Sequence, residues 1–154
     1  MKHRFLFFMT ALIMSLSTLF LPMQAAADDF STTEIVKFED GSYLEIITEQ
    51  IDMRTSYTKS GSKTYNFRNK NNEIEWKAVH SASFTYTGSS ATCTSASCTV
   101  TTYSNDWYVV SKSTTRSGNT STTQLTMGEK VLGVTISKPS YTITLSCDAN
   151  GNLS

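Results

Sequence analysis

The feature that most constrains the fold of this chain is a strict two-residue alternation from Ile74 to Tyr86. Successive side chains of a β-strand point to opposite faces, whereas a helix brings together residues three and four apart. The segment is therefore predicted to be one long strand with a single face turned to a core. That face carries Ile74, Trp76, Ala78, His80, Ala82, Phe84 and Tyr86.

The remaining apolar runs are shorter and are separated by turn residues. Two β-prone runs over 35–47 meet at Asp40-Gly41, which predicts a hairpin with a two-residue turn and with Phe38 facing Tyr43 across the strands. Gly118-Asn119 is predicted to be a second hairpin turn. Further strands are expected over 98–103, 107–115, 120–127, 131–137 and 141–147.

Eight to nine short strands with regular turns are typical of an all-β domain. No stretch after the N-terminal segment has a sustained period of 3.6 residues. The predicted fold is an antiparallel β-sandwich, immunoglobulin-like, and the alternative is a small β-barrel.

The N-terminus has the pattern of a signal peptide. A basic start at 2–4 precedes an apolar run over 5–21, and three alanines at 25–27 provide a cleavage site. We expect residues 1–27 to be removed and residues 28–154 to form one domain.

The rival interpretation is an uncleaved anchor, since Phe5–Met23 has the length of a short membrane span, but Pro22 disfavours it. No cysteine follows the apolar run to take a lipid anchor. The expected product is secreted, with no membrane insertion after cleavage. Without Lys2 and Arg4, 11 basic residues face 13 acidic ones, a net charge of −2 that gives no reason to expect nucleic acid as a partner.

Three cysteines, Cys93, Cys98 and Cys147, allow one disulfide and one spare thiol. Cys93 and Cys98 flank four residues that would place them opposite each other if those residues turned a hairpin. Cys147 lies on the apolar face of the last predicted strand, where a bond to Cys93 would fasten that strand. We favour Cys93 with Cys147 and keep Cys93 with Cys98 as the alternative.

No catalytic constellation is visible in the sequence. His80 is the only histidine after the signal peptide and is expected to be a buried, hydrogen-bonded structural residue. A single imidazole excludes the common zinc sites, so no metal site is predicted, and no motif calls for a cofactor. We therefore expect a protein that is not an enzyme.

The best candidate binding residues are two tyrosines. Tyr103 and Tyr108 flank the predicted turn at Asn105, where they could form an exposed stacking surface for a sugar or a peptide. The expected partner is an extracellular protein or a glycan.

Several turn and core motifs cover most of the chain after residue 27: Phe38–Leu44, Gly61–Tyr65, Trp76-Lys77, Phe84–Cys93, Trp107, Thr142–Asp148 and Asn150–Asn152. Together these motifs resemble a group of small secreted proteins of gut Firmicutes. The resemblance implies an exported Gram-positive protein, and it supplies no activity or site residue.

Three functions follow as hypotheses. The first is a non-enzymatic domain that binds a surface, matrix or glycan partner. The second is a structural or assembly module that acts by strand addition at a sheet edge. The third is a small hydrolase, which would require His80 or a carboxylate pair in a cleft.

Overall fold

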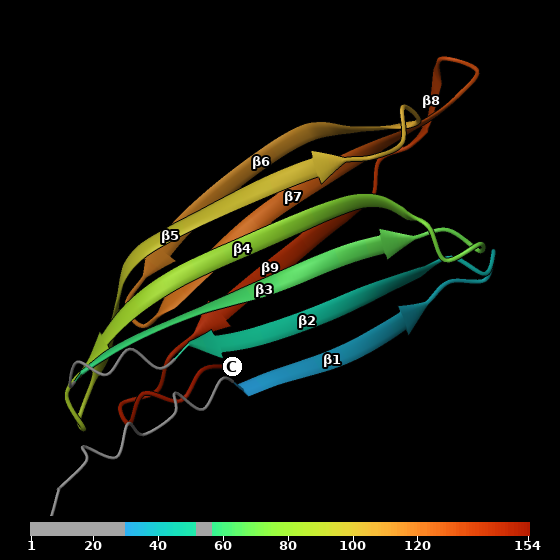
Figure 1. Ribbon diagram of the computed structural model, residues 1–154. Helices are drawn as coiled ribbons and strands as arrows, with labels where there is room; N and C mark the ends of the chain where they lie inside the picture. The colour runs from blue at the N-terminus through green and yellow to red at the C-terminus, as the bar shows by residue number, and fades with distance from the viewer. Residues whose placement is uncertain (1–29, 52–56) are drawn as a thin grey trace, which may run out of the picture.

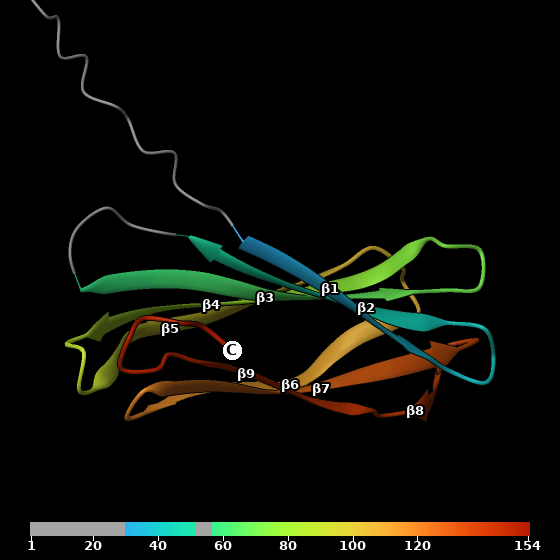
Figure 2. The ribbon, with the colours of Figure 1, turned by 90° about the horizontal axis from the view of Figure 1, so that it is seen from below.

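The computed structural model describes residues 30–51 and 57–154, so the predicted signal peptide lies outside the described residues. Every regular element described is a β-strand, and the strands form two facing layers (Figures 1 and 2). The strands are β1 Phe30–Lys37, β2 Tyr43–Ile51, β3 Thr58–Arg68, β4 Ile74–Tyr86, β5 Ala91–Thr102, β6 Trp107–Ser117, β7 Thr120–Val131, β8 Val134–Ser137 and β9 Ser140–Ser146.

The predicted antiparallel sandwich is confirmed, and the sheets do not close into a barrel. One sheet has the order β1-β2-β3-β4-β5, and in the other β7 pairs with β6, β8 and β9. Most neighbouring strands are also consecutive in the chain, as in a meander. Immunoglobulin domains divide their strands between sheets in Greek-key order, so the connections here differ from the expected immunoglobulin-like ones.

β8 and β9 share one edge of β7. β6 pairs with β7 along nearly its whole length, which leaves a single edge of β7 for other partners. β9 pairs with residues 120–126 of β7 and β8 with residues 129–131. The smaller sheet is therefore three strands wide, against five for the sheet it packs on.

The alternation of β4 has the predicted effect. Trp76, Ala78 and Phe84 are fully buried, whereas the intervening side chains are at least partly exposed. The core divides into two clusters along the sandwich. The larger contains Leu44, Phe67, Trp76, Ala78, Cys98, Trp107, Leu125, Met127 and Ile143, and the smaller contains Ala82, Phe84, Cys93, Leu145 and Cys147.

The hairpin of β1 and β2 forms, but its predicted register is wrong by one residue. Phe38 faces Ser42 through a backbone hydrogen bond of 3.0 Å, so the loop has three residues and Phe38 and Tyr43 point to opposite faces. Gly41 has a φ of 85°, which suits the last residue of a three-residue loop. The Asp40 carboxylate accepts hydrogen bonds from the Ser42 backbone N–H and hydroxyl, which fixes this longer turn.

The turn considered between Cys93 and Cys98 is absent, because β5 runs through both residues. The pairing with β4 shifts between Ser83 and Phe84, so that Thr94 is an extra residue in β5. Side chains five residues apart on a regular strand face opposite ways. The bulge reverses this, and both cysteines are buried.

The strand predicted over 131–137 is interrupted. Leu132 and Gly133 have φ values of 52° and 81°, as in the tight turn of a two-residue hairpin. The chain therefore reverses between β7 and β8. This short hairpin brings Ser137 opposite Glu129.

Candidate functional site

A cleft with a volume of about 360 Å³ opens at the end of the sandwich where the β1–β2 loop meets the start of β9. Its residues come from both sheets, so only the folded chain assembles it. We call it the end cleft. It is lined by Phe38, Asp40, Ser42, Phe67, Trp107, Glu129, Ser137, Pro139 and Tyr141.

Aromatic rings form the apolar wall of the end cleft. The ring centroids of Phe67 and Trp107 are 4.9 Å apart, and those of Phe38 and Phe67 are 6.0 Å apart. Behind them the buried Trp76 stacks on Phe67 at 5.6 Å and contacts the Tyr141 ring at 5.0 Å. These offset and tilted contacts are favourable for aromatic pairs and hold the wall in place without a ligand.

The exposed part of this wall is small. Phe38 is 41% exposed, whereas Phe67 and Trp107 are 9% and 6% exposed. The cleft therefore offers one open ring and the edges of others, which suits a compact group better than a broad flat one.

Carboxylates stand at the rim of the end cleft. Asp40 and Glu129 line it directly, and both also line an adjoining pocket of about 280 Å³ that contains Glu75. The one cation in that adjoining lining is Lys70. Three carboxylates and one ammonium give the combined lining of these two pockets an excess of negative charge.

Hydrogen bonds hold each rim carboxylate in place. The Ser42 hydroxyl donates to Asp40 over 2.6 Å, and the Ser137 hydroxyl donates to Glu129 over 2.9 Å. Glu75 accepts from the indole N–H of Trp107, which joins the rim to the aromatic wall. These bonds fix the oxygens at defined positions before any ligand arrives.

The Ser42 hydrogen bonds also determine the ionisation of Asp40. The hydroxyl of Ser42 and then its backbone N–H lower the pKa of this carboxyl. At the inner wall, burial raises the pKa of Tyr141 to about 12, and the Glu129 carboxylate adds to the rise. At neutral pH the cleft thus contains an ionised Asp40 beside a neutral phenol.

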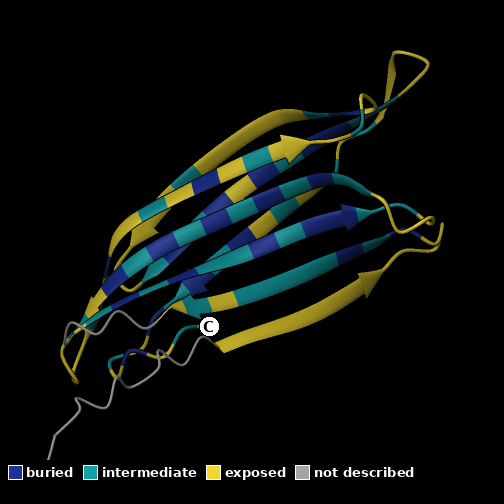
Figure 3. Cartoon of the chain, viewed as in Figure 1, coloured by how far each residue is buried: buried dark blue, intermediate teal, exposed yellow. Residues whose placement is uncertain are grey.

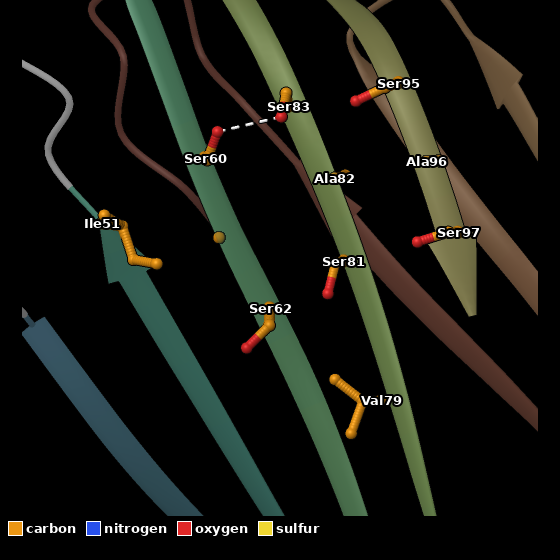
Figure 4. A pocket seen from close by; sticks show the side chains of 11 residues that line it. Ile51, Ser60, Ser62, Val79, Ser81, Ala82, Ser83, Ser95, Ala96 and Ser97 are labelled. Atoms are coloured by element: carbon orange, nitrogen blue, oxygen red, sulfur yellow. Dashed lines mark hydrogen bonds between the residues drawn. The ribbon is translucent and has the colours of Figure 1, made fainter. Parts of the chain in front are cut away.

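A second depression lies on the outer face of the five-stranded sheet (Figure 4). It has a volume of about 340 Å³, and six of its lining residues are serines from β3, β4 and β5. Ser60 and Ser83 bond to each other over 2.9 Å. Its lining contains no charged side chain and no aromatic ring, so nothing in it would anchor one ligand over another. The lining residues are Ile51, Ser60, Gly61, Ser62, Val79, Ser81, Ala82, Ser83, Ser95, Ala96 and Ser97.

His80 is buried and hydrogen-bonded, as predicted. Its Nε2 lies 2.8 Å from the Ser121 hydroxyl and its Nδ1 lies 2.9 Å from the Thr123 hydroxyl, and the residue is 0% exposed. Burial lowers the pKa of this imidazole, and the charge of Lys63 lowers it further. His80 lies on β4 between the sheets and lines neither the end cleft nor the serine depression.

Cys93, Cys98 and Cys147 are buried free thiols in this structure, so the predicted disulfide is not formed in it. The Cys93–Cys98 alternative is wrong, because the two residues lie five positions apart on one extended strand and disulfide partners have Cα atoms within about 7 Å. Cys93 and Cys147 belong to the same core cluster, and Cys98 belongs to the other. Burial raises the pKa of all three thiols, which opposes formation of a nucleophilic thiolate.

The two candidate tyrosines lie outside the end cleft. Tyr103 is 61% exposed in the turn after β5. The ring of Tyr108 lies against Gly128, its hydroxyl is 2.9 Å from that of Thr135, and the Lys130 ammonium is 4.4 Å from its centroid. Tyr108 thus already covers its own sheet, and a shared stacking surface of the two tyrosines stays a prediction.

Sequence reasoning missed the residues that make the end cleft. The sequence predicts Asp40 only as a turn residue and Phe38 only as a cross-strand partner. It does contain a usable signal, because an acidic turn flanked by an aromatic residue ends one predicted hairpin. Nothing in the sequence indicates that Trp107 and Glu129 belong to the same site as Asp40, since the three residues come together only when the sheets pack.

Among the residues that the structure describes, no three side chains of His, Cys, Asp or Glu gather as ligands for a metal ion. None of the described segments forms a helix long and apolar enough to cross a membrane. Comparisons with protein-family models, with curated proteins and with solved structures find no match to this chain.

Proposed function

We propose that this chain is an exported, non-enzymatic binding domain whose end cleft takes a cationic group of an extracellular partner, such as the side chain of a lysine or arginine. The observation that carries the proposal is the placement of three carboxylates around an aromatic wall. Export and removal of residues 1–27 belong to the same proposal and rest on the N-terminal pattern.

Both parts of the cleft favour a cation. An ammonium or guanidinium near an aromatic face gains about 0.5–2 kcal/mol from the ring quadrupole. Charge-assisted hydrogen bonds to Asp40 and Glu129 would add to this, because both carboxylates are already oriented by serine hydroxyls. The methylene stem of a lysine or arginine would lie against Phe38 and Pro139 while its charged head reaches the rim.

The described residues support binding better than catalysis. His80 has both ring nitrogens engaged inside the core, and the cysteine thiols are buried with raised pKa values. At the end cleft the hydroxyls of Ser42 and Ser137 bond only to carboxylates, and no histidine is among the described residues that line the cleft. The rim carboxylates remain the groups to test for hydrolysis, which is the competing hypothesis.

The test is isothermal titration of the domain with N-acetyl-lysine methylamide and with the matching arginine compound, and neutral monosaccharides serve as the rival ligand class. We expect weak saturable binding of the cations, with a dissociation constant that rises with ionic strength. Binding of the neutral sugars alone would overturn the cationic assignment and favour a glycan partner.

Variants locate the site. Glu129→Gln and Asp40→Asn keep the shape of each side chain and remove its charge, and each should raise the dissociation constant about tenfold, which corresponds to about 1.4 kcal/mol. Glu49→Gln is the matched control, since Glu49 lies on the outer face and bonds Ser62 there. Equal effects of all three substitutions would place binding elsewhere and contradict the proposal.

A further inference from the structure

The five-stranded sheet is wider than the sheet that packs on it. Its extra strands, β1 and β2, lie together on one side. β9 packs against β3 and β4 of the larger sheet. In Figure 1 it lies behind these strands, and β2 and β1 extend beyond it. A fourth full-length strand beside β9 would complete the smaller sheet, and the described chain supplies only Leu153 and Ser154 there.

The inner face of β1 is consequently uncovered, and that of β2 is only partly covered. We call the inward-facing residues Thr32, Glu34, Val36, Ile46 and Thr48 the β1–β2 shelf. The three that belong to β1 are exposed, as is the whole of that strand (Figure 3). Val36 is 39% exposed although its neighbour across the pair, Leu44, is buried. The shelf thus lies on the core-facing side of the larger sheet but has no second layer over its outer strand.

The free edge of β9 presents backbone groups beside the shelf. The N–H and C=O of Ser146 bond to Ser154 and therefore point away from β7. Alternate residues of a strand share this direction, so Thr144 and Thr142 point the same way. The Thr142 carbonyl accepts a hydrogen bond of 3.3 Å from the Tyr65 hydroxyl, and no partner for the Thr144 backbone N–H is found among the described residues.

The last residues of the chain show how a strand fits on this edge. Leu153 forms an antiparallel bridge with Cys147, and Ser154 bonds with Ser146 in both directions. The side chain of Leu153 points to the larger sheet and lies over Gly61. An added strand therefore runs antiparallel to β9 and turns every second side chain toward the larger sheet.

We propose that the free edge of β9 and the β1–β2 shelf bind one extended segment of a partner polypeptide as an added β-strand. The segment pairs with Ser140–Leu145 and places apolar side chains at the alternate positions that face the shelf. Backbone pairing supplies affinity in such complexes, and the alternating side chains supply specificity.

A second folded copy does not fit this place. If two copies paired through their β9 strands, β3 of the second copy would lie about one strand spacing, 4.8 Å, from β3 of the first. β2 already occupies that position. A single extended segment has no second layer and avoids the collision, which is why the occupant is a strand and not a sheet.

The charges of the site favour an uncharged segment. Burial lowers the pKa of Lys63 on the adjoining face of β3, and the negative charge of Glu34 on the shelf partly offsets this. One acidic and one basic group leave no net charge to neutralise. The other shelf side chains are threonine, valine and isoleucine.

β9 is a better acceptor than β1, the edge strand of the larger sheet on the same side. A strand added to β1 would gain backbone bonds but would have no sheet opposite it. Glu34 and Lys37 also place charges on β1, which is a common protection of edge strands. A strand added to β9 gains backbone bonds and also covers Ile46, the shelf residue that pairs with Tyr65 of β3.

The experiment adds a six-residue tail of alternating valine and threonine after Ser154 of the whole domain. A tail that begins with valine directs its valines to the shelf, and one that begins with threonine directs them to solvent, since a shift of one residue exchanges the faces. We expect the valine-first tail to raise Tm by about 5 °C or more and the threonine-first tail to raise it by less than half as much. Equal shifts, or none, would overturn the proposal.

Two further measurements separate strand pairing from non-specific stickiness. Amide exchange at Thr142 and Thr144 should slow at least tenfold with the valine-first tail and with the same peptide added in trans. Thr144→Pro removes an N–H that β7 does not use, so the variant should fold and lose the effect of the tail. An unchanged effect in this variant would show that the tail binds elsewhere. These readouts are taken without a cationic ligand, because Tyr141 lies in the paired range and also lines the end cleft.

Discussion

At the scale of single residues, the most informative group is the buried imidazole of His80. It joins β4 to β7 through the hydroxyls of Ser121 and Thr123, each of which can donate or accept a hydrogen bond. The Thr123 hydroxyl is also hydrogen-bonded to the Thr114 hydroxyl, at a distance of 2.7 Å. A neutral histidine therefore satisfies a polar network inside the core, and this explains why an all-β domain places its one described histidine between the sheets.

The network predicts how stability depends on pH. The pKa of His80 is lower in the folded chain than its ordinary value of 6.5, so the unfolded state binds more protons between these two values. The stabilising contribution of neutral His80 is complete above about pH 6.5 and is lost as pH falls toward the lowered pKa. Unfolding in urea across pH 8 to 4 should show this decline, at up to about 1.4 kcal/mol per pH unit.

His80→Gln supplies the control for this prediction. It should lower the free energy of unfolding at pH 8 by about 1–3 kcal/mol, because buried hydroxyls lose partners. It should also flatten the dependence on pH between 6.5 and the lowered pKa. If the free energy of unfolding of His80→Gln depends on pH as steeply as that of the natural chain, the dependence comes from the carboxylates and the prediction is wrong.

At the scale of strands, the alternation of β4 was sufficient to predict its face, and the turn and bulge chemistry was not. Gly41 and Asp40 identified the β1–β2 hairpin, but the hydrogen bonds from Ser42 to Asp40 lengthened its loop and changed the register. In β5 the bulge at Thr94 depends on pairing with β4, which periodicity alone does not reveal. Local patterns thus predicted which strands exist, and contacts between strands decided how they align.

The β2–β3 pair gives a prediction at this scale. A Cβ added at Gly61 would lie 2.7 Å from the backbone carbonyl oxygen of Glu49 and would also meet the Leu153 side chain. The carbonyl belongs to a strand and cannot move freely, so Gly61→Ala should lower the free energy of unfolding by about 1–3 kcal/mol. Ser62→Ala, on the partly exposed face of the same strand, should change it by less than about 0.5 kcal/mol. Denaturant titration of both variants tests the difference, and equal values would mean that β2 and β3 separate easily.

At the scale of the whole molecule, packing of two sheets creates both candidate interaction sites. The end cleft combines Asp40 of the first hairpin with Glu129, which lies 89 positions later in the chain. The shelf exists because one sheet is wider than the other. No spacing in the sequence predicts either site, since each depends on which strands face each other and on how far each sheet extends.

The thiols allow a covalent prediction at the same scale. The backbone N–H of Cys93 bonds to the Gly118 carbonyl and that of Cys147 to the Asn119 carbonyl, so both strands meet the same hairpin turn. In protein recovered from culture medium we expect a Cys93–Cys147 disulfide, which would stabilise the fold by about 4 kcal/mol in the loop-entropy model. Non-reducing peptide mapping identifies the bond and an N-terminus at Asp28. A Cys98 disulfide, or three free thiols, would contradict this prediction.

The measurement that tests the central claim most directly is an NMR titration of the domain with N-acetyl-lysine methylamide, observed at the two tryptophan indoles. Trp107 lines the end cleft and donates to Glu75, whereas Trp76 is fully buried behind the aromatic wall. The account predicts a saturable shift of the Trp107 indole N–H, a much smaller one for Trp76, and a midpoint at about tenfold higher ligand concentration in Glu129→Gln. An unperturbed Trp107 at millimolar ligand, or an unchanged response in Glu129→Gln, would contradict the assignment of the end cleft as a cation-binding site.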